Sequence, residues 1–252
     1  MRIMRGMKTT SGHRRTFLLG AGTALGWAAL SSSPAAGAKN GEKKGERDKS
    51  AKDEAKGDED IGPGEDLMRE HGVLRRVLLV YGELARRLEA GKAFDPAALR
   101  ESAAIVRAFV EDYHERQEED FLFPRFERAH VLVELVGVLR AQHQAGRKVT
   151  ERIQAAATPA TLGDAAARGR LRADLLAFIR MYEPHAARED TVLFPALHGL
   201  VSRSEYDALG EDFERREHQT FGEDGFEHAV ARVDAVEKTL GIEDLSQFTP
   251  KA

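Results

Sequence analysis

The sequence has 252 residues and contains no cysteine. That absence excludes disulfide bonds, thiolate metal ligands, cysteine nucleophiles and a lipidated cysteine anchor. It does not set the compartment, because a core of this size can hold without disulfides. After residue 38 there is also no stretch long and apolar enough to span a membrane. No GxGxxG turn, P-loop or Ser/His/Asp arrangement is present either, so those enzyme classes have no support.

Basic residues are scarce outside the N-terminus. The first 38 residues contain five basic residues and no acidic one, which leaves 33 basic against 42 acidic residues in the remainder, a formal charge of −9. Binding to phosphate backbones requires a net basic surface. We therefore expect no nucleic-acid partner.

The N-terminus has the three regions of an export signal. Basic residues precede a short apolar run at 17–30, and Ala36-Gly37-Ala38 supplies the small residues of a cleavage site. Arg14-Arg15, followed by Thr-Phe-Leu-Leu, resembles the bacterial twin-arginine signal, which implies the twin-arginine translocation machinery as a partner. We predict a signal peptide at 1–38 and a periplasmic or otherwise exported protein, membrane-anchored if the signal is not cleaved. A disordered tail or a single membrane anchor is the alternative.

The next segment, 39–62, is charged and rich in glycine, which predicts a flexible linker. From Gly64 onward, apolar residues recur every three or four positions in four segments separated by glycine and proline. Short connections make consecutive helices antiparallel, so we predict an all-α fold with an up-down-up-down four-helix bundle at 63–200. We expect the second helix to end at Pro124 and the fourth to be closed by Pro195 and Gly199, and Pro184 to kink or break the fourth. Residues 201–252 should form a helical extension packed on the bundle.

Each apolar stripe carries a histidine near its middle, and two stripes also carry a glutamate. The segments HERQEEDFLFP, from His114, and HAAREDTVLFP, from His185, repeat a His and a Glu four residues apart, and such a pair shares one helix face. A buried carboxylate without compensation costs several kcal/mol or becomes neutral. A shared cation resolves that cost, and imidazole with carboxylate but no thiolate suits iron, manganese or zinc. Histidines and glutamates that simply pair with one another in a structural bundle are the alternative.

At these residues the sequence resembles the hemerythrin-like (HHE cation-binding) family, over about residues 62–240. Carried over position by position, the resemblance implies the metal ligands His71, His114, Glu118, His143, His185 and Glu189. It implies two iron ions bridged by the two glutamates and by an oxo or hydroxo group, rather than manganese or zinc. Oxygen-carrying hemerythrins have a further histidine where this chain has Arg147, so the pattern is closer to the bacterial variety with four His and two Glu. Each iron would then keep an open position for O2, peroxide or NO.

Three further residues are candidates for a second shell around the ligands. Glu115 follows His114 but faces about 100° away on the helix, so it is either solvated or second-shell. Tyr81 and Tyr182 lie on the apolar stripes near the ligands. They could donate a hydrogen bond to a bound oxygen species, act as a radical sink, or simply pack with a polar tip.

Two functions remain open beside the structural alternative. The first is an exported di-iron oxidoreductase that reacts with O2, peroxide or NO and receives electrons from an unspecified donor. The second is a module that binds, senses or stores iron or a small gas without turnover.

Overall fold

The computed structural model describes residues 61–250, so the predicted signal peptide and nearly all of the predicted linker lie outside the described residues. Within the described part the chain is all-helical and has no strand, which confirms the all-α part of the predicted fold class. None of its helices combines the length and apolar character needed to cross a membrane.

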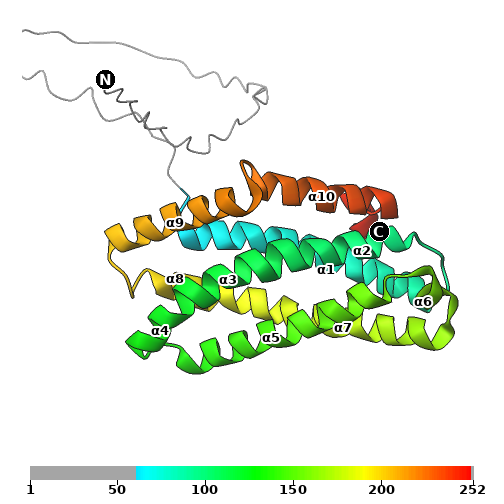
Figure 1. Cartoon of the computed structure of the whole chain (residues 1–252), viewed down its shortest axis with the longest axis horizontal. Helices are drawn as coiled ribbons and strands as arrows, with labels where there is room; N and C mark the ends of the chain where they lie inside the picture. Colours follow the sequence, from blue (N-terminus) through cyan, green and yellow to red (C-terminus); the bar gives the residue numbers. More distant parts are fainter. Residues whose placement is uncertain (1–60, 251–252) are drawn as a thin grey trace, which may run out of the picture. The chain divides into compact units, whose positions relative to one another are not determined.

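Two helical hairpins and a C-terminal pair make up this part of the chain (Figure 1). The first hairpin comprises α1 (Pro63–Glu89) and a second long segment divided into α2 (Pro96–Ile105), η1 (Val106–His114), α3 (Glu115–Gln117), η2 (Glu118–Leu122) and α4 (Phe123–Ala129). The second hairpin comprises α5 (Val133–Ala156), the short α6 (Pro159–Gly163), and a long segment divided into α7 (Ala165–Arg188), η3 (Glu189–Leu193) and α8 (Phe194–Leu197). The C-terminal pair is α9 (Arg203–Phe221) and α10 (Gly225–Leu240), followed by a 3-10 turn, η4 (Leu245–Phe248).

Side-chain caps define several helix starts. Asp95 accepts a hydrogen bond from the Ala97 amide at the start of α2, and Asp164 accepts one from the Ala167 amide at the start of α7. Ser202 does the same for α9. Each cap satisfies an amide that has no partner within its helix, which typically stabilises the helix by about 1 kcal/mol.

The second ligand-bearing segment does not end at Pro124, contrary to the sequence prediction, whereas the fourth ends between Pro195 and Gly199 as expected. α4 continues past Pro124 to Ala129, and α8 continues past Pro195 to Leu197. A π-helical stretch precedes each proline, η2 in one case and η3 in the other. In an ordinary α-helical turn proline lacks the amide for one hydrogen bond and its ring clashes with a carbonyl of the preceding turn. The wider π turn leaves room for the ring. Pro184 likewise lies inside α7, so it does not separate two shorter helices.

The apolar core consists of two clusters with the polar residues between them. Along α1, Leu67 belongs to one cluster and Leu74 to the other, with His71 between them. Along α5, Leu139 and Ile153 flank His143 in the same order. Tyr113 and Leu122 flank the second segment's ligands in the reverse order, as do Tyr182 and Leu193 in the fourth. The four histidines predicted as ligands therefore occupy one layer of the helical bundle.

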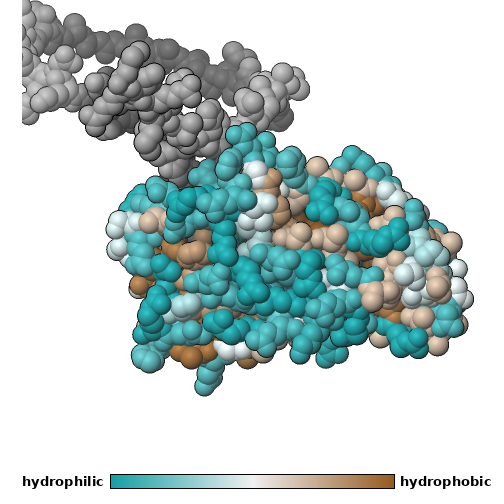
Figure 2. All heavy atoms as spheres, viewed as in Figure 1, coloured by the Kyte–Doolittle hydropathy of each residue, from teal (hydrophilic) through white to brown (hydrophobic). Residues whose placement is uncertain are grey.

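The C-terminal pair packs against the first hairpin. α10 contacts α1 and α2, and α9 contacts α1. Arg76 of α1 binds Glu237 of α10, and Tyr206 of α9 accepts a hydrogen bond from the Gly64 amide. The face of the molecule seen in Figure 2 is mostly hydrophilic, with scattered apolar residues of the kind that most protein surfaces show.

Candidate metal centre

The structure brings the six sequence-predicted ligands together. They form two groups that share the same two glutamates, and within each group one candidate ligand atom per residue lies within 4.8 Å of the others. We call the group with His71 and His114 the first position, and the group with His143 and His185 the second position. Both include Glu118 and Glu189. All six residues are buried, none more than 3% exposed.

In each position two imidazole Nε2 atoms face one another. The Nε2 atoms of His71 and His114 are 3.1 Å apart, and those of His143 and His185 are 3.2 Å apart. Glu189 Oε2 lies 3.3 Å from His71 Nε2 and 3.1 Å from His185 Nε2, so it reaches both positions. Glu118 Oε2 lies 3.4 Å from His143 Nε2 and 3.9 Å from His114 Nε2, so it does the same. Both glutamates therefore lie between the two histidine pairs.

In each of the four candidate ligand histidines, the Nδ1 atom, which we call the outer nitrogen, lies beside its own hydrogen-bond acceptor. His71 Nδ1 lies 2.7 Å from Asp190, and His143 Nδ1 lies 3.1 Å from Glu119. The remaining two pairs are His114 with Glu70 at 2.7 Å and His185 with Gln142 at 2.9 Å. An acceptor at Nδ1 fixes the ring orientation and the tautomer that leaves Nε2 free to bind a metal.

These contacts cross between the hairpins with approximate twofold symmetry. Asp190 comes from the second hairpin and binds His71 of the first, whereas Glu119 comes from the first and binds His143 of the second. Phe194 stacks on His71 with ring centroids 5.6 Å apart, and its repeat counterpart Phe123 stacks on His143 at 5.5 Å. The internal repeat in the sequence is thus a repeat of the surroundings as well as of the ligands.

The bridging glutamates have opposite protonation tendencies. Burial raises the pKa of Glu118 well above its usual range, and the neighbouring Glu189 raises it further. Burial also raises the pKa of Glu189, but the adjacent His185 and His71 outweigh it and hold that pKa well below its usual range. Two carboxylates this close cannot both ionise without a compensating positive charge.

The pKa values of the ligand histidines are likewise shifted in opposite directions. Burial lowers the pKa of His71, but the hydrogen bond to Asp190 and the nearby Glu189 carboxylate outweigh it and raise the value to about 9. Burial lowers the pKa of His143 to about 4, and burial together with His71 holds that of His114 well below its usual range. At neutral pH, His114 and His143 are therefore neutral and can donate a lone pair.

A pair of metal ions fits these residues. All four carboxylate oxygens of Glu118 and Glu189 are buried and accept no hydrogen bond from the described residues, although buried acceptors are almost always paired. Two nitrogens bound side by side to one metal at about 2.1 Å are about 3 Å apart, which is close to the separation within each histidine pair. Imidazole with carboxylate is a donor set that iron accepts readily.

The three second-shell candidates differ in their contacts with the ligands and with one another. Glu115 is buried, so the solvated alternative is wrong: Tyr182 donates a hydrogen bond to it at 2.6 Å, and Arg147 forms an ion pair with it at 2.7 Å. The Tyr182 ring also lies against His185, with centroids 5.3 Å apart. Tyr81 is buried against Phe178, and its hydroxyl has no hydrogen-bond partner among the described residues.

Sequence reasoning missed the residues that hold the histidines from outside. Glu70 and Gln142 directly precede His71 and His143, and Glu119 and Asp190 directly follow the bridging glutamates. Their equivalent places in the repeat were a usable signal, because a polar residue beside every ligand on a buried face needs a partner. Which histidine each one binds could not be read from the sequence, since the contacts run between hairpins.

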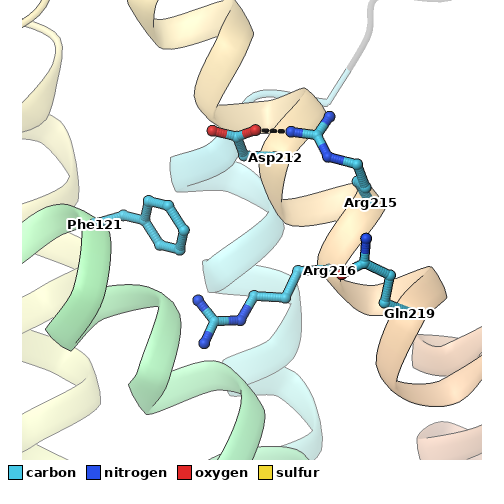
Figure 3. A pocket seen from close by; sticks show the side chains of 5 residues that line it. All are labelled: Phe121, Asp212, Arg215, Arg216 and Gln219. Atoms are coloured by element: carbon cyan, nitrogen blue, oxygen red, sulfur yellow. Dashed lines mark hydrogen bonds and ion pairs between the residues drawn. The ribbon is translucent and has the colours of Figure 1, made fainter.

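A separate pocket lies where α9 meets η2 (Figure 3). Phe121 of η2 and four residues of α9 line it, and none of the six ligands does. The Arg216 guanidinium lies 5.3 Å from the Phe121 ring centroid and 2.9 Å from Asp120, so it holds α9 against η2.

Comparison with known proteins supports a metal site at these residues. Uncharacterized proteins from Mycobacterium bovis and from two strains of Mycobacterium tuberculosis are 54% identical to this chain over 186 residues, which is 74% of this chain and 73% of each of theirs. No solved structure matches the chain closely enough to count as similar. The model of the hemerythrin HHE cation-binding domain matches residues 63–197, and that stretch contains all six residues of the centre. This chain is a member of the hemerythrin HHE cation-binding family, and its His/Glu clusters indicate a metal site suited to iron.

Proposed function

We propose that the chain is an exported non-haem di-iron protein that binds or reacts with O2, peroxide or NO. The observation that carries this proposal is the pair of bridging glutamates, whose four buried oxygens have no hydrogen-bond donor among the described residues. His71 and His114 would hold one iron, His143 and His185 the other, and Glu118 and Glu189 both. When bound, iron supplies the one-electron chemistry that no side chain of this site provides.

The protein's own residues determine what can reach the irons. Every ligand is at most 3% exposed, which favours a diatomic gas or peroxide over a larger substrate. Four histidines and two carboxylates leave coordination positions open on each iron, which reaction with a small ligand requires. The outer acceptors orient the four imidazoles before any ion binds.

We also infer that the four long segments form the up-down-up-down bundle expected from their short connections. The alternating order in which they pass between the two apolar clusters supports this arrangement. Export rests on the resemblance of the first 38 residues to a twin-arginine signal. That route carries folded proteins, so the iron could be loaded before transport.

Metal stoichiometry tests the di-iron proposal. We expect two iron ions per chain in the wild type, and a visible spectrum typical of a bridged diferric centre. Glu118→Ala should lose both ions because Glu118 belongs to both positions, whereas His114→Ala should lose at least one. His198→Ala is the matched control, since His198 is about half-exposed and lies outside both positions. Two irons retained in Glu118→Ala would contradict the proposal.

Peroxide consumption by the iron-loaded chain then separates the two functions. Loss of peroxide above the free-iron background, abolished in His114→Ala, supports an oxidoreductase. Stable binding of O2 or NO without consumption of peroxide supports the alternative, a module that binds, senses or stores iron or a gas.

A further inference from the structure

The two metal positions differ at one place behind the ligands. In the first position both outer nitrogens face carboxylates, Asp190 behind His71 and Glu70 behind His114. In the second position one faces a carboxylate, Glu119 behind His143, and the other faces the neutral amide of Gln142. Glu70 and Gln142 occupy equivalent places in the internal repeat, each immediately before a ligand histidine.

Solvation does not explain this difference. Glu70 is only 2% exposed, whereas Gln142 is partly exposed. Burying a carboxylate costs far more than burying an amide, so solvation alone would place the charge at residue 142 and the amide at residue 70. The ionisable member of the pair therefore lies where a negative charge is costly unless a cation is nearby.

The structure also provides dedicated support for Glu70. The amide of Gln117 lies within 3.5 Å of both carboxylate oxygens, and the Tyr113 hydroxyl also hydrogen-bonds to this carboxylate. At the equivalent places the second hairpin has Arg188, which is exposed, and Pro184, which has no side-chain donor. Only one of the two positions has this additional set of contacts.

A carboxylate behind an imidazole makes it a better ligand. It draws the Nδ1 proton toward itself and raises the electron density at Nε2, an effect that changes metal affinity by 10–100-fold in other sites. Arg147 increases the difference, because it binds Glu119 while only 17% exposed, whereas Arg75 binds Asp190 from a half-exposed place. Glu119 is thereby the weaker acceptor of the two.

We propose that the two positions are inequivalent and that the first position, His71 with His114, takes up a divalent cation first and more tightly than the second. This inference rests on the proposed two-metal centre and deepens it. The residue that decides the order is Glu70, a positioning residue that touches no metal and acts through His114.

Titration of the metal-free full chain with Co2+, followed by visible absorption, tests the order. The variants are Glu70→Gln and Gln142→Glu, each of which exchanges a carboxyl group and an amide with almost no change in shape. Glu70→Gln should weaken the first binding step roughly tenfold and leave the second nearly unchanged. Gln142→Glu should strengthen the second step by a similar factor and leave the first nearly unchanged. The double exchange should give back two steps close to those of the wild type.

The outcomes separate this inference from the proposed function. Fewer than two Co2+ bound by the wild type would count against the two-metal centre itself. Two Co2+ bound with neither variant altering a step, or with Glu70→Gln acting on the second step, would overturn the inequivalence alone. Circular dichroism of the metal-free variants checks the fold, and Gln142→Glu lies at a partly exposed place where a charge is tolerated.

Discussion

The first hairpin (63–129) and the second hairpin (133–197) supply the same ligands in the same order but differ in what surrounds them. The second segment of the first hairpin carries Glu111, Glu115 and Glu119 at every fourth position, and the last two form ion pairs with Arg147 of the second hairpin. The equivalent residues of the second hairpin are Tyr182, Ala186 and Asp190. The acidic row on one hairpin is thus neutralised largely by groups from the other.

This difference separates the parts of the repeat that the proposed metal centre constrains from those that packing constrains. The ligands and their stacked phenylalanines are the same in both halves, as two ions with the same geometry would require. The residues one turn away are complementary instead, because they meet across the interface of the hairpins. Thr150 illustrates this: its hydroxyl donates to buried Glu111 at 2.5 Å, and its counterpart in α1 is the apolar Leu78.

Exchanging one glycine in each hairpin should have opposite effects. In Gly146→Ala the new Cβ would overlap the Tyr182 hydroxyl and lie 2.8 Å from its Cζ atom. Tyr182 is buried and bound to Glu115, so it cannot move aside without losing that hydrogen bond. We expect the free energy of unfolding to fall by about 2–3 kcal/mol, as measured by chemical denaturation of the metal-free chain.

Gly72→Ala is the matched change in the first hairpin. Gly72 is exposed in α1, and an added Cβ there has no atom within 4 Å. Alanine should therefore stabilise the helix by up to about 1 kcal/mol. If Gly146→Ala were as neutral as Gly72→Ala, the close contact between α5 and Tyr182 would not exist in solution. Tyr182→Phe should partly relieve Gly146→Ala, because it removes the hydroxyl that overlaps most.

The two glycines also show how much of the structure could be predicted from the sequence. The ligand layer was predictable, because His and Glu at a spacing of four on an apolar stripe are rare without a cation and the segment recurs. The place of Gly146 was not, since a glycine on an apolar stripe says nothing of the side chain that approaches it from another helix. Pro124 misled in the same way, because proline normally ends a helix and only the π turn before it allows continuation.

Glu115 shows why burial around the site was harder to predict than the ligands. Its angle on the helix correctly placed it off the ligand face, yet a neighbouring helix covers that direction too. The sequence contains Arg147 and Tyr182, but their approach to Glu115 depends on how the hairpins pack. Contacts within one helix follow from spacing, whereas contacts between hairpins follow from the fold.

The two arginines at equivalent places, Arg75 and Arg147, should differ in importance. Arg147 bridges Glu115 and Glu119 at 2.7 and 2.9 Å, and together His143 and Arg147 lower the pKa of Glu119 to about 2 against the effect of burial. Among the described residues Arg75 forms an ion pair with Asp190 alone, and it is about half-exposed. Arg147→Gln should cost about 2 kcal/mol of stability because a buried carboxylate loses its partner, and Arg75→Gln less than about 1 kcal/mol.

Denaturation of the metal-free variants measures both costs. Adding Glu115→Gln to Arg147→Gln should recover part of the loss, since the carboxylate left without a partner is then removed, whereas adding it to Arg75→Gln should recover nothing. Equal costs for the two arginines would mean that the ion pairs around Glu115 contribute no more than exposed ones.

The histidines at equivalent places, His71 and His143, should give the smallest effect and the most specific one. The folded pKa of His71 is raised to about 9, so its contribution to stability is complete below about 6.5 and is lost as the pH rises through 9. Burial raises the pKa of Glu70 and of Glu115 to about 8, so they too lose stability as the pH rises from about 4.5 to 8. The pKa of His143 is lowered to about 4, so it opposes this trend only below about 6.5.

The Tm of the metal-free chain should therefore fall by roughly 5 °C between pH 6.5 and 9. The fall should be smaller in His71→Gln, while exposed His198→Gln should follow the wild type. Bound metal should reverse the slope, because His71 must lose its proton before Nε2 can bind an ion. A metal-free Tm that stays level or rises over this range would show that His71 is neutral in the folded chain, and the contrast between the two histidines would then be wrong.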